Sequence, residues 1–295
     1  MRPLAAILLL ALALHGVEGK PFRLASWNLQ NYLSGNRFEE GSFRLEYPMP
    51  EKRKARIRQL LHQARPDILF LQEIGSAAHL KELQMDLAAG GLSYPYARFS
   101  ASPEARSGLA FLSMIPPAEV LFHDPLPLDP HGAPGNVLPR GIQEVRFLIG
   151  GNPLRLFHVH LKSRYSADPA DPESLRLRAA GLAALHHFLS LHLLADPSSA
   201  FALVGDLNTP FSSPLLRPLR AQWIPIASAD ADHAPWTYLH RASGSREVLD
   251  GFWIPIIRPS PLRPSLILPT RNPPSDHRLV LASLFLKKSL APPSY

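Results

Sequence analysis

Two kinds of apolar pattern alternate along this chain, and their order limits the folds that it can adopt. Short apolar runs of strand length recur in both halves of the sequence, and amphipathic segments with helical spacing lie between them. Ile57 and Leu61, for example, lie one turn apart in a helix predicted over residues 51–64. Because strands outnumber helices while helices separate them in both halves, the pattern predicts two stacked sheets with helices outside.

The bounds of the predicted elements follow from the length of each run and from the residues that flank it. Strands are predicted at residues 22–28, 67–71, 94–99, 108–113, 118–122, 143–149, 154–160, 200–204, 248–254 and 279–285. Helices are predicted at residues 51–64, 77–88 and from Asp171 to about Ala195, with Pro172 at the first helical position. The five strands between residues 94 and 160 are predicted to form a meander.

Proline is the outlier in the composition, with 32 residues in 295, about twice its usual share. The hydrophobic fraction of 46% nevertheless suits a folded protein and excludes wholesale disorder. We therefore expect long, proline-rich loops on a folded scaffold, chiefly residues 123–140 and 223–246, and loops of this length are often functional. No internal repeat and no Gly/Ser linker divides the chain, which favours a single domain over residues 20–290 with a short tail at 291–295.

The first 19 residues are typical of a cleaved secretory signal. Arg2 precedes an apolar run from Leu4 to Leu14, and Val17 and Gly19 occupy the positions three and one before the expected cut. This run is too short for a membrane anchor, which needs about 20 apolar residues. We therefore expect a secreted or periplasmic protein with no membrane span after cleavage. The chain has no Cys, which excludes disulfides and lipoprotein attachment, so burial alone must stabilise the fold.

Polar residues gather where several predicted strands end. These islands are Trp27-Asn28, Gln72-Glu73, His158 to Ser163, Gly205 to Pro210 and Ser275 to His277, with Asp250 as a sixth element inside an apolar strand. Each has a structural explanation of its own, because a carboxylate at a strand end is often a turn or cap residue. A single histidine is often packed in a core, and Asp250 could pair with the nearby Arg246.

Taken together, the residue types in these islands suit the hydrolysis of a phosphate ester. That reaction needs neutralised phosphoryl oxygens, an activated water and a stabilised leaving group. Glu73 offers the oxygen ligands that a hard cation such as Mg²⁺ prefers, and Asn28 and Asp276 complete or orient its shell. Asp206 is the candidate that orients and deprotonates the attacking water. Asn208, two positions on, would share its face of an extended segment and hold a phosphoryl oxygen or the nucleophile.

In this order the islands resemble the endonuclease/exonuclease/phosphatase superfamily, which includes pancreatic-type deoxyribonucleases, exonuclease III, sphingomyelinases and inositol-polyphosphate phosphatases. The resemblance extends from Asn28 to His277. Its most specific parts are Gly205-Asp206-Leu207-Asn208 and Ser275-Asp276-His277, backed by Gln72-Glu73. It implies an α+β fold, a four-layer helix–sheet–sheet–helix sandwich with the site at one end of the sheets. It also implies a metal-dependent hydrolase that uses Mg²⁺, with Mn²⁺ or Ca²⁺ as alternatives.

The same resemblance implies roles for the remaining residues. Asp250 would fix the tautomer of His277 and favour its charged form, so that the imidazolium binds the scissile phosphate. His160 matches the position where the deoxyribonuclease and sphingomyelinase branches carry histidine, as an acid or a phosphate ligand. A weaker set of cations near this edge could reach an anionic substrate, with a solvated or structural role equally open for each: Arg140, Lys162 and Arg164.

Four positions depart from particular branches of the superfamily. Gln30 stands where the exonuclease III branch places an acid that helps to hold metal, and His160 stands where that branch has tyrosine. These two differences disfavour an abasic-site endonuclease. Thr209 and Pro210 replace the tyrosine and arginine of the inositol-polyphosphate phosphatases, which disfavours that specificity.

The net charge of +7 favours an anionic partner. Because four of the acids are assigned to the site, the basic excess on the rest of the chain is larger still. We therefore expect a secreted, Mg²⁺-dependent phosphodiester hydrolase, a nuclease with little sequence preference that binds nucleic acid through its backbone. No stable protein partner is implied.

Two other functions remain open at this point. One is a phosphatase or sphingomyelinase-like phospholipase that acts on small phosphate esters or lipid head groups, and the other is a binding module without catalysis. Exposed aromatic residues near the site would favour the lipid alternative, and the candidates are Trp223, Trp236 and Phe252-Trp253, although burial would explain them equally well.

Overall fold

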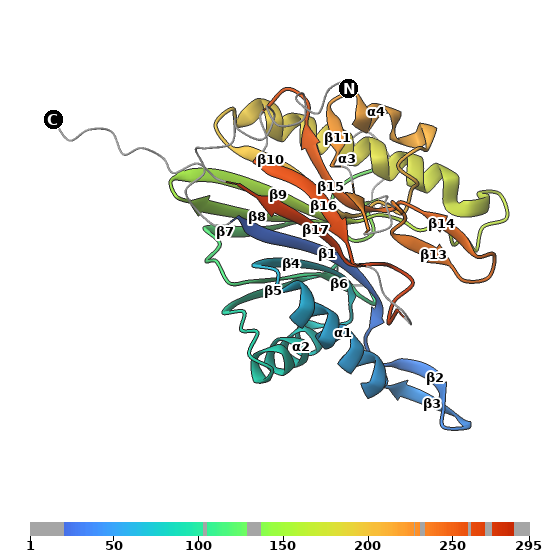
Figure 1. The fold of residues 1–295 in the computed structure, drawn as a ribbon. Coiled ribbons are helices and arrows are strands. Elements are labelled where there is room, and N and C mark those ends of the chain that lie inside the picture. The colour runs from blue at the N-terminus through green and yellow to red at the C-terminus, as the bar shows by residue number, and fades with distance from the viewer. Residues whose placement is uncertain are drawn as a thin grey trace, which may run out of the picture.

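Two β-sheets pack face to face, and helices cover the outer face of each (Figure 1). The computed structural model describes residues 21–102, 105–128, 137–226, 228–230, 234–258, 261–268 and 273–285. The predicted signal at 1–19 and the tail at 291–295 lie outside the described residues, as do parts of both long loops. The layers confirm the predicted helix–sheet–sheet–helix sandwich.

The first sheet has seven strands in the order β12-β16-β17-β1-β4-β6-β5. Its strands are β1 (Phe22–Tyr32), β4 (Ile68–Ile74), β5 (Tyr96–Ser100), β6 (Gly108–Ser113), β12 (Ser228–Ala229), β16 (Leu262–Ile267) and β17 (Val280–Leu284). Two helices, α1 (Glu51–Ala64) and α2 (Ala77–Ala89), cover its outer face. Ile57 of α1, Leu83 of α2 and Trp27 of β1 belong to the buried cluster between them.

The second sheet has six strands in the order β11-β15-β10-β9-β8-β7. Its strands are β7 (Glu119–His123), β8 (Ile142–Ile149), β9 (Asn152–His160), β10 (Ala200–Asp206), β11 (Trp223–Pro225) and β15 (Asp250–Pro255). The helices on its outer face are η2 (Pro172–Ser174), α3 (Leu175–Ala195), η3 (Pro214–Leu216) and α4 (Arg217–Arg220). The predicted start of the long helix at Asp171 is wrong: Asp171 and Pro172 open the short η2, the positive φ of Glu173 interrupts the helical backbone, and α3 begins at Leu175. Asp171 still contacts the start of α3, because its Oδ1 accepts a hydrogen bond from the Arg176 backbone N–H at 2.9 Å. No helix in the described part of the chain is long and apolar enough to cross a membrane.

The predicted single meander between residues 94 and 160 is wrong. β5 and β6 pair in the first sheet, whereas β7, β8 and β9 pair in the second. The chain therefore crosses from one sheet to the other between β6 and β7. All five strands face an apolar layer, so their alternating pattern could not show which sheet each one joins.

Two hairpins extend beyond the sheets at the same end of the molecule (Figure 1). One is formed by β2 (Gly35–Glu39) and β3 (Ser42–Tyr47), and the other by β13 (Tyr238–His240) and β14 (Ser245–Glu247). The sequence did not predict either hairpin. Their strands are short and largely exposed, so they lack the alternation that burial imposes on the strands of the sandwich.

The layer between the sheets determines where the site lies. Alternate residues of each strand face this layer, and Leu24, Phe70 and Val204 belong to its buried cluster. Toward one end of the strands, the side chains at these inward positions change from apolar to polar, and they include Asn28, Gln72, His160 and Asp206. The candidate site is therefore the polar end of the core between the sheets.

Candidate active site

Asp206 ends β10 at the centre of the site. In the register of the second sheet it lies opposite His160 of β9 on one side and Asp250 of β15 on the other. The preceding residue, Gly205, has a φ of +132°, and a Cβ added there would lie 2.0 Å from the carbonyl oxygen of Val159. Only glycine allows the two strands to approach this closely, so Gly205 is required to place Asp206 beside His160.

Two asparagines hold the Asp206 carboxylate. Asn28 Nδ2 donates a hydrogen bond to Asp206 Oδ2 at 3.0 Å, and the backbone N–H of Asn208 donates to Oδ1 at 2.7 Å. Asn208 Nδ2 donates to the carbonyl oxygen of Leu161 at 2.9 Å and lies 3.3 Å from Asp206 Oδ2. The prediction of an extended segment was wrong, because Asn208 has a φ of +49°. This left-handed turn brings its side chain back to the Asp206 carboxylate.

Glu73 reaches the site through an irregularity at the end of β4. In a regular strand Gln72 would face the layer between the sheets, and Glu73 would face the helices. Glu73 has a φ of +64°, and the pairing with β6 shifts register between Gln72 and Ile74. Its carboxylate instead lies beside the end of β1, where it accepts hydrogen bonds from Asn28 Nδ2 at 3.1 Å and from the Asn31 backbone N–H at 2.7 Å.

His277 and Asp250 form a carboxylate–imidazole pair. His277 Nδ1 lies 2.9 Å from Asp250 Oδ2, and Thr237 Oγ1 donates a hydrogen bond to the same oxygen at 2.7 Å. Burial alone would lower the pKa of His277, but the negative charges of Asp250 and Asp206 raise it to about 10. His277 is therefore an imidazolium at neutral pH, and its Nε2 lies 3.8 Å from Asp206 Oδ2.

His160 and Asp206 face each other with shifted pKa values. Burial, reinforced by the charge of Arg140, holds the pKa of His160 well below its usual range, so this imidazole is neutral. Burial and the negative charge of Asp250 raise the pKa of Asp206 to about 7. His160 Nε2 lies 3.5 Å from Asp206 Oδ2 and 3.8 Å from Glu73 Oε1. This arrangement provides a neutral imidazole and a carboxyl group that can exchange a proton near neutral pH.

The donor atoms of the site fit a hard divalent cation. Burial raises the pKa of Asp276, and the nearby charge of Glu73 adds to the effect. As for Asp206, burial is the larger cause and a neighbouring carboxylate the smaller one, so a bound cation would favour the charged form of both groups. Oxygen donors of this kind suit Mg²⁺, Mn²⁺ or Ca²⁺. Asp250 and His277 already pair with each other, which leaves Glu73 as the first candidate to hold the ion, oriented by Asn28.

The three weaker cations differ in their surroundings. Arg140 Nη1 donates to the carbonyl oxygen of Leu161 at 3.2 Å, the same oxygen that Asn208 Nδ2 contacts. Lys162 Nζ instead donates to backbone carbonyls of its own loop, and Arg164 pairs with Glu247 at 2.6 Å. Contact with a substrate phosphate stays a prediction for all three, and the geometry favours Arg140.

The structure adds two site residues that the sequence did not single out. Thr237 Oγ1 accepts the backbone N–H of Asp250 at 3.1 Å while it donates to the Asp250 carboxylate, so it fixes this residue at both ends. The ring of Tyr238 lies 4.8 Å from the ring of His277. Both residues come from the segment predicted as a long loop at 223–246, where no apolar period or motif marks them, and Tyr238 begins β13. Asp250 does not pair with Arg246, whose guanidinium lies over the ring of Trp236.

The aromatic residues considered for a lipid site are placed elsewhere. Trp223, Phe252 and Trp253 are fully or almost fully buried in the two apolar clusters of the second sheet. Trp236 is half-buried and lies beneath Arg278, at 4.0 Å from the guanidinium carbon to the ring centre. Trp223, Phe252 and Trp253 therefore pack the core, whereas the half-buried Trp236 has the guanidinium groups of Arg246 and Arg278 over its ring.

Comparison with known proteins places this geometry in a wider group. Sphingomyelinase C from Streptomyces griseocarneus superposes with a TM-score of 0.64 at 18% identity, over 90% of this chain and 100% of that one. Truncated TDP2 from Caenorhabditis elegans superposes with a TM-score of 0.58 at 17% identity. The match covers 92% of this chain and 99% of that one. A beta toxin variant from Staphylococcus aureus, with bound magnesium ions, superposes with a TM-score of 0.65 at 16% identity. The match covers 90% of this chain and 100% of that one. No curated protein matches the chain in sequence. At these identities the structures show a common fold.

A match to a sequence family is more specific. The Endonuclease/Exonuclease/phosphatase family matches residues 25–277. This region begins within β1, ends at His277 and therefore includes every residue of the site described above. The chain thus belongs to the endonuclease/exonuclease/phosphatase family of metal-dependent phosphoric ester hydrolases.

Proposed function

We propose that this protein is a secreted, Mg²⁺-dependent phosphodiesterase that cleaves nucleic acid with little sequence preference. The observation that carries the hydrolytic part is the position of Asp206, a buried carboxyl group with a pKa near 7 between the neutral His160 and the imidazolium of His277. A base must titrate near the working pH and lie within reach of the water that it activates. The secretory assignment rests on the sequence of residues 1–19 alone.

Most residues of the site have a defined task in this reaction. The Asp206 carboxylate accepts the proton of the attacking water, and Asn28 and Asn208 hold that carboxylate in place. The water oxygen bonds to phosphorus as the ester bond breaks, and the leaving oxygen takes its proton from solvent water. The imidazolium of His277 stabilises the charge on the phosphoryl oxygens. A divalent ion held by Glu73, with Asn28 and Asp276 nearby, would supply further charge neutralisation. Magnesium is favoured because the beta toxin variant contains it.

A pocket beside Asn208 supports nucleic acid as the substrate. It has a volume of about 530 Å³, and its lining includes Tyr165, Tyr238 and His240. Aromatic rings in a pocket are suited to stack on nucleobases, which contributes to strand binding without sequence preference. The pocket adjoins the reaction centre through Asn208, so a base next to the scissile phosphate would lie within its reach.

A panel of substrates tests this proposal. Plasmid DNA, single-stranded DNA and RNA should be degraded with Mg²⁺ or Mn²⁺, and a chelator should stop the reaction. If these polymers stay intact while a small phosphodiester or a phosphomonoester is hydrolysed, the nuclease assignment is wrong and the phosphoesterase assignment stands.

The variant Asp206→Asn tests the assignment of the base. Asparagine has nearly the same shape but cannot accept a proton, so kcat should fall by about three orders of magnitude or more. Thermal unfolding should be unaffected or shift upward, because the neutral amide removes the repulsion between Asp206 and Asp250. Full activity in the variant would refute the assignment.

One observation favours the lipid alternative as the second candidate. The hairpin of β2 and β3 carries three largely exposed apolar side chains, with exposed fractions of 72% for Phe38, 65% for Phe43 and 71% for Leu45. Exposed apolar clusters often mark contact with a membrane or a partner. Sphingomyelin vesicles therefore belong in the same panel, and phosphocholine release in preference to nucleic acid cleavage would support this alternative.

A further inference from the structure

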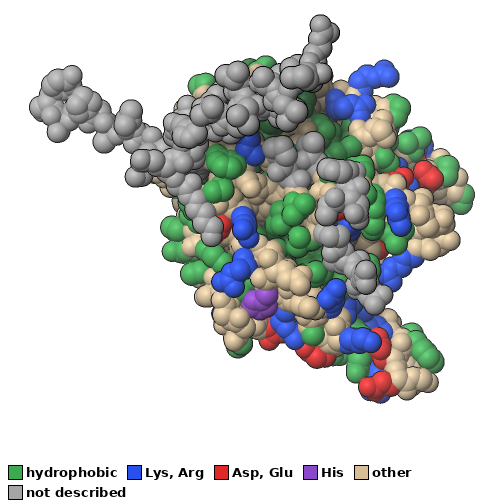
Figure 2. All heavy atoms as spheres, viewed as in Figure 1, with side chains coloured by type: hydrophobic (Ala, Val, Ile, Leu, Met, Phe, Trp, Pro, Cys, Tyr) green, Lys and Arg blue, Asp and Glu red, His purple; other side chains and the backbone are tan. Residues whose placement is uncertain are grey.

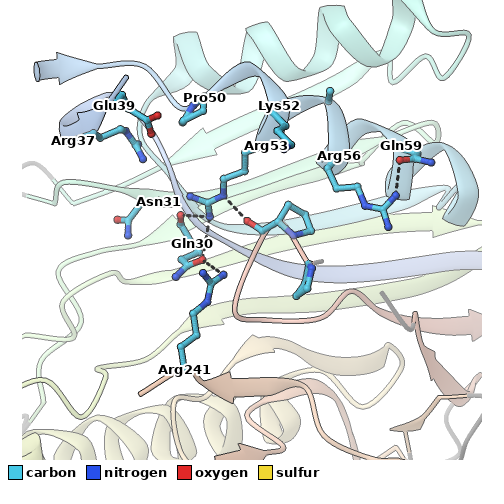
Figure 3. Close-up of a pocket in the computed structure, with 13 residues that line it drawn as sticks. Gln30, Asn31, Arg37, Glu39, Pro50, Lys52, Arg53, Arg56, Gln59 and Arg241 are labelled. Atoms are coloured by element: carbon cyan, nitrogen blue, oxygen red, sulfur yellow. Dashed lines mark hydrogen bonds between the residues drawn. The ribbon is translucent and has the colours of Figure 1, made fainter. Parts of the chain in front are cut away.

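A basic cleft lies beside the active site and has no role in the chemistry described so far (Figure 3). It has a volume of about 940 Å³, near the upper end of the range for pockets that hold a drug-sized ligand. The N-terminal part of α1, the first residues of the β2–β3 hairpin and the turn between β13 and β14 supply its walls. Its described charged residues are one glutamate, Glu39, and five cations: Arg37, Lys52, Arg53, Arg56 and Arg241.

The cleft is continuous with the metal-binding side of the active site. Gln30 and Asn31 line it, and the Asn31 backbone N–H donates to the Glu73 carboxylate at 2.7 Å. Gln30 Oε1 lies 3.4 Å from Arg241 Nη2 and accepts a hydrogen bond from the Asp276 backbone N–H at 3.2 Å. A ligand that crosses Glu73 can therefore continue into the cleft without leaving the surface.

The cations of the cleft differ in how they are engaged. Arg53 has a structural task, because its guanidinium donates to the backbone carbonyls of Leu29, Gln30 and Pro274 and so ties the end of β1 to the segment before His277. Burial and the charge of Arg37 lower the pKa of Arg53 to about 10, which shows how closely like charges are placed here.

Lys52 and Arg241 are the exposed cations of the cleft. They face it from opposite sides, Lys52 from α1 and Arg241 from the turn after β13 (Figure 3). Figure 2 shows further Lys and Arg side chains on the surface near α1 and the base of the β2–β3 hairpin. A concave surface with this excess of positive charge attracts polyanions.

We propose that the cleft binds the phosphates that flank the scissile one, and that it thereby selects a single strand of nucleic acid over small phosphate esters. The inference rests on the proposed nuclease function. The cleft lies beyond Glu73 and the aromatic pocket lies beyond Asn208, so one strand can occupy both while its scissile phosphate faces Asp206. Backbone phosphates are recognised by charge alone, which agrees with cleavage at many sequences.

The double variant Lys52→Ala/Arg241→Ala tests the proposal. Its kcat/KM is measured on a single-stranded oligonucleotide and on a small diester with one phosphate. The value on the strand divided by the value on the diester should be lower than for the unaltered protein. The salt slope is the steepness with which the logarithm of kcat/KM falls against the logarithm of the salt concentration. For single strands each phosphate contact contributes about 0.7 to it, so the loss of two contacts should decrease the slope by about 1.4. Between 50 and 200 mM salt, the loss of kcat/KM on the strand should then be about sevenfold smaller than for the unaltered protein.

Two control variants separate charge from structure. Lys52→Arg/Arg241→Lys keeps both charges and should retain the ratio and the salt slope. Lys81→Ala removes an exposed cation from α2, on the outer side of the first sheet, and should alter neither activity. A duplex substrate serves as a further comparison, and a larger effect of the double variant on duplex than on single strands would contradict the choice of a single strand.

The outcomes distinguish the cleft from the proposed function. If the unaltered protein cleaves the strand and the double variant keeps both the ratio and the salt slope, the role of the cleft is refuted and the nuclease function stands. An equal loss on both substrates would show that the two residues support the active site only, which also refutes the proposal. If the unaltered protein hydrolyses the small diester but not the strand, the nuclease function fails, and the cleft proposal fails with it.

Discussion

At the scale of single residues, the pair of Asp250 and His277 shows how a buried carboxylate holds a positive charge on an imidazole. The Asp250 carboxylate contacts His277 and Thr237, and its charge is the main reason why His277 carries a proton at neutral pH. Thr237 donates a hydrogen bond to the same carboxylate, so the partner of His277 Nδ1 is held in one orientation. The pair therefore acts on the reaction through the charge of His277.

Asp250→Asn should change the pH profile of the enzyme. The pKa of His277 is raised to about 10 in the folded protein, so activity that needs the imidazolium is present below this pH and is lost as the pH rises through it. Without the carboxylate charge this alkaline limb should move toward neutral pH. The profile of kcat/KM against pH, measured on a small diester, shows the shift. An unchanged alkaline limb in a folded variant would contradict the role given to Asp250.

His158 gives a second residue-scale prediction, on stability. It lies buried between Gln72 and Gln143, with Nδ1 3.1 Å from Gln143 Oε1, and burial lowers its pKa to about 3. The unfolded chain binds a proton at this residue near pH 6.5 and the folded chain does not, so stability is lost as the pH falls from 6.5 toward 3. The contribution between pH 6.5 and pH 4 should be about 3 kcal/mol.

The variant His158→Gln cannot be protonated and should show a smaller loss of stability in acid. Denaturant unfolding at pH 7 and pH 4, for both proteins, measures the difference. Equal pH dependence in the two would show that folding does not lower the pKa of His158.

At the scale of elements, the sequence located most of the sandwich. The helix α1 has the predicted bounds, residues 51–64, because Pro50 precedes it and its apolar spacing is regular. β1 was predicted to end at Asn28, but after an irregularity at Gln30 and Asn31, which have positive φ values, it resumes pairing with β4 at Tyr32. No propensity indicates such an irregularity. The two projecting hairpins and the assignment of strands to sheets were missed, because they depend on contacts between distant segments.

The same distinction applies to the site. Each candidate residue stood out in the sequence as a polar residue beside an apolar strand, and these strand ends meet in space. Asp206 ends β10, whereas Asp250 begins β15 and His277 precedes β17. The sequence could not show how Glu73 and Asn208 reach the site, because both depend on left-handed backbone conformations at single positions. It also could not identify the cleft, whose walls come from α1 and from both hairpins.

At the scale of the whole molecule, metal binding should be coupled to folding. Burial disfavours the charged carboxylates of Asp206 and Asp276, and the charges of Asp250 and Glu73 add to the rise in their pKa values, so a cation at the site should be stabilising. Mg²⁺ at 100 times its dissociation constant should stabilise the folded protein by about 2.7 kcal/mol, which corresponds to several degrees in Tm for a chain of this size. Thermal unfolding with increasing Mg²⁺ measures this effect, and Glu73→Gln should reduce it. If Mg²⁺ causes no shift, the alternative of a binding module without catalysis gains support.

The active site is divided between the two sheets. Asn28, Glu73 and His277 come from the first sheet or the segment leading into it, whereas His160, Asp206 and Asp250 come from the second. Neither sheet alone carries a complete set of catalytic groups, so the distances in the site depend on how the sheets slide and rotate against each other. Substitutions in the apolar layer around Phe70 and Val204 can therefore alter the reaction rate without touching the substrate. The reaction rate of this enzyme thus reports the alignment of its two halves.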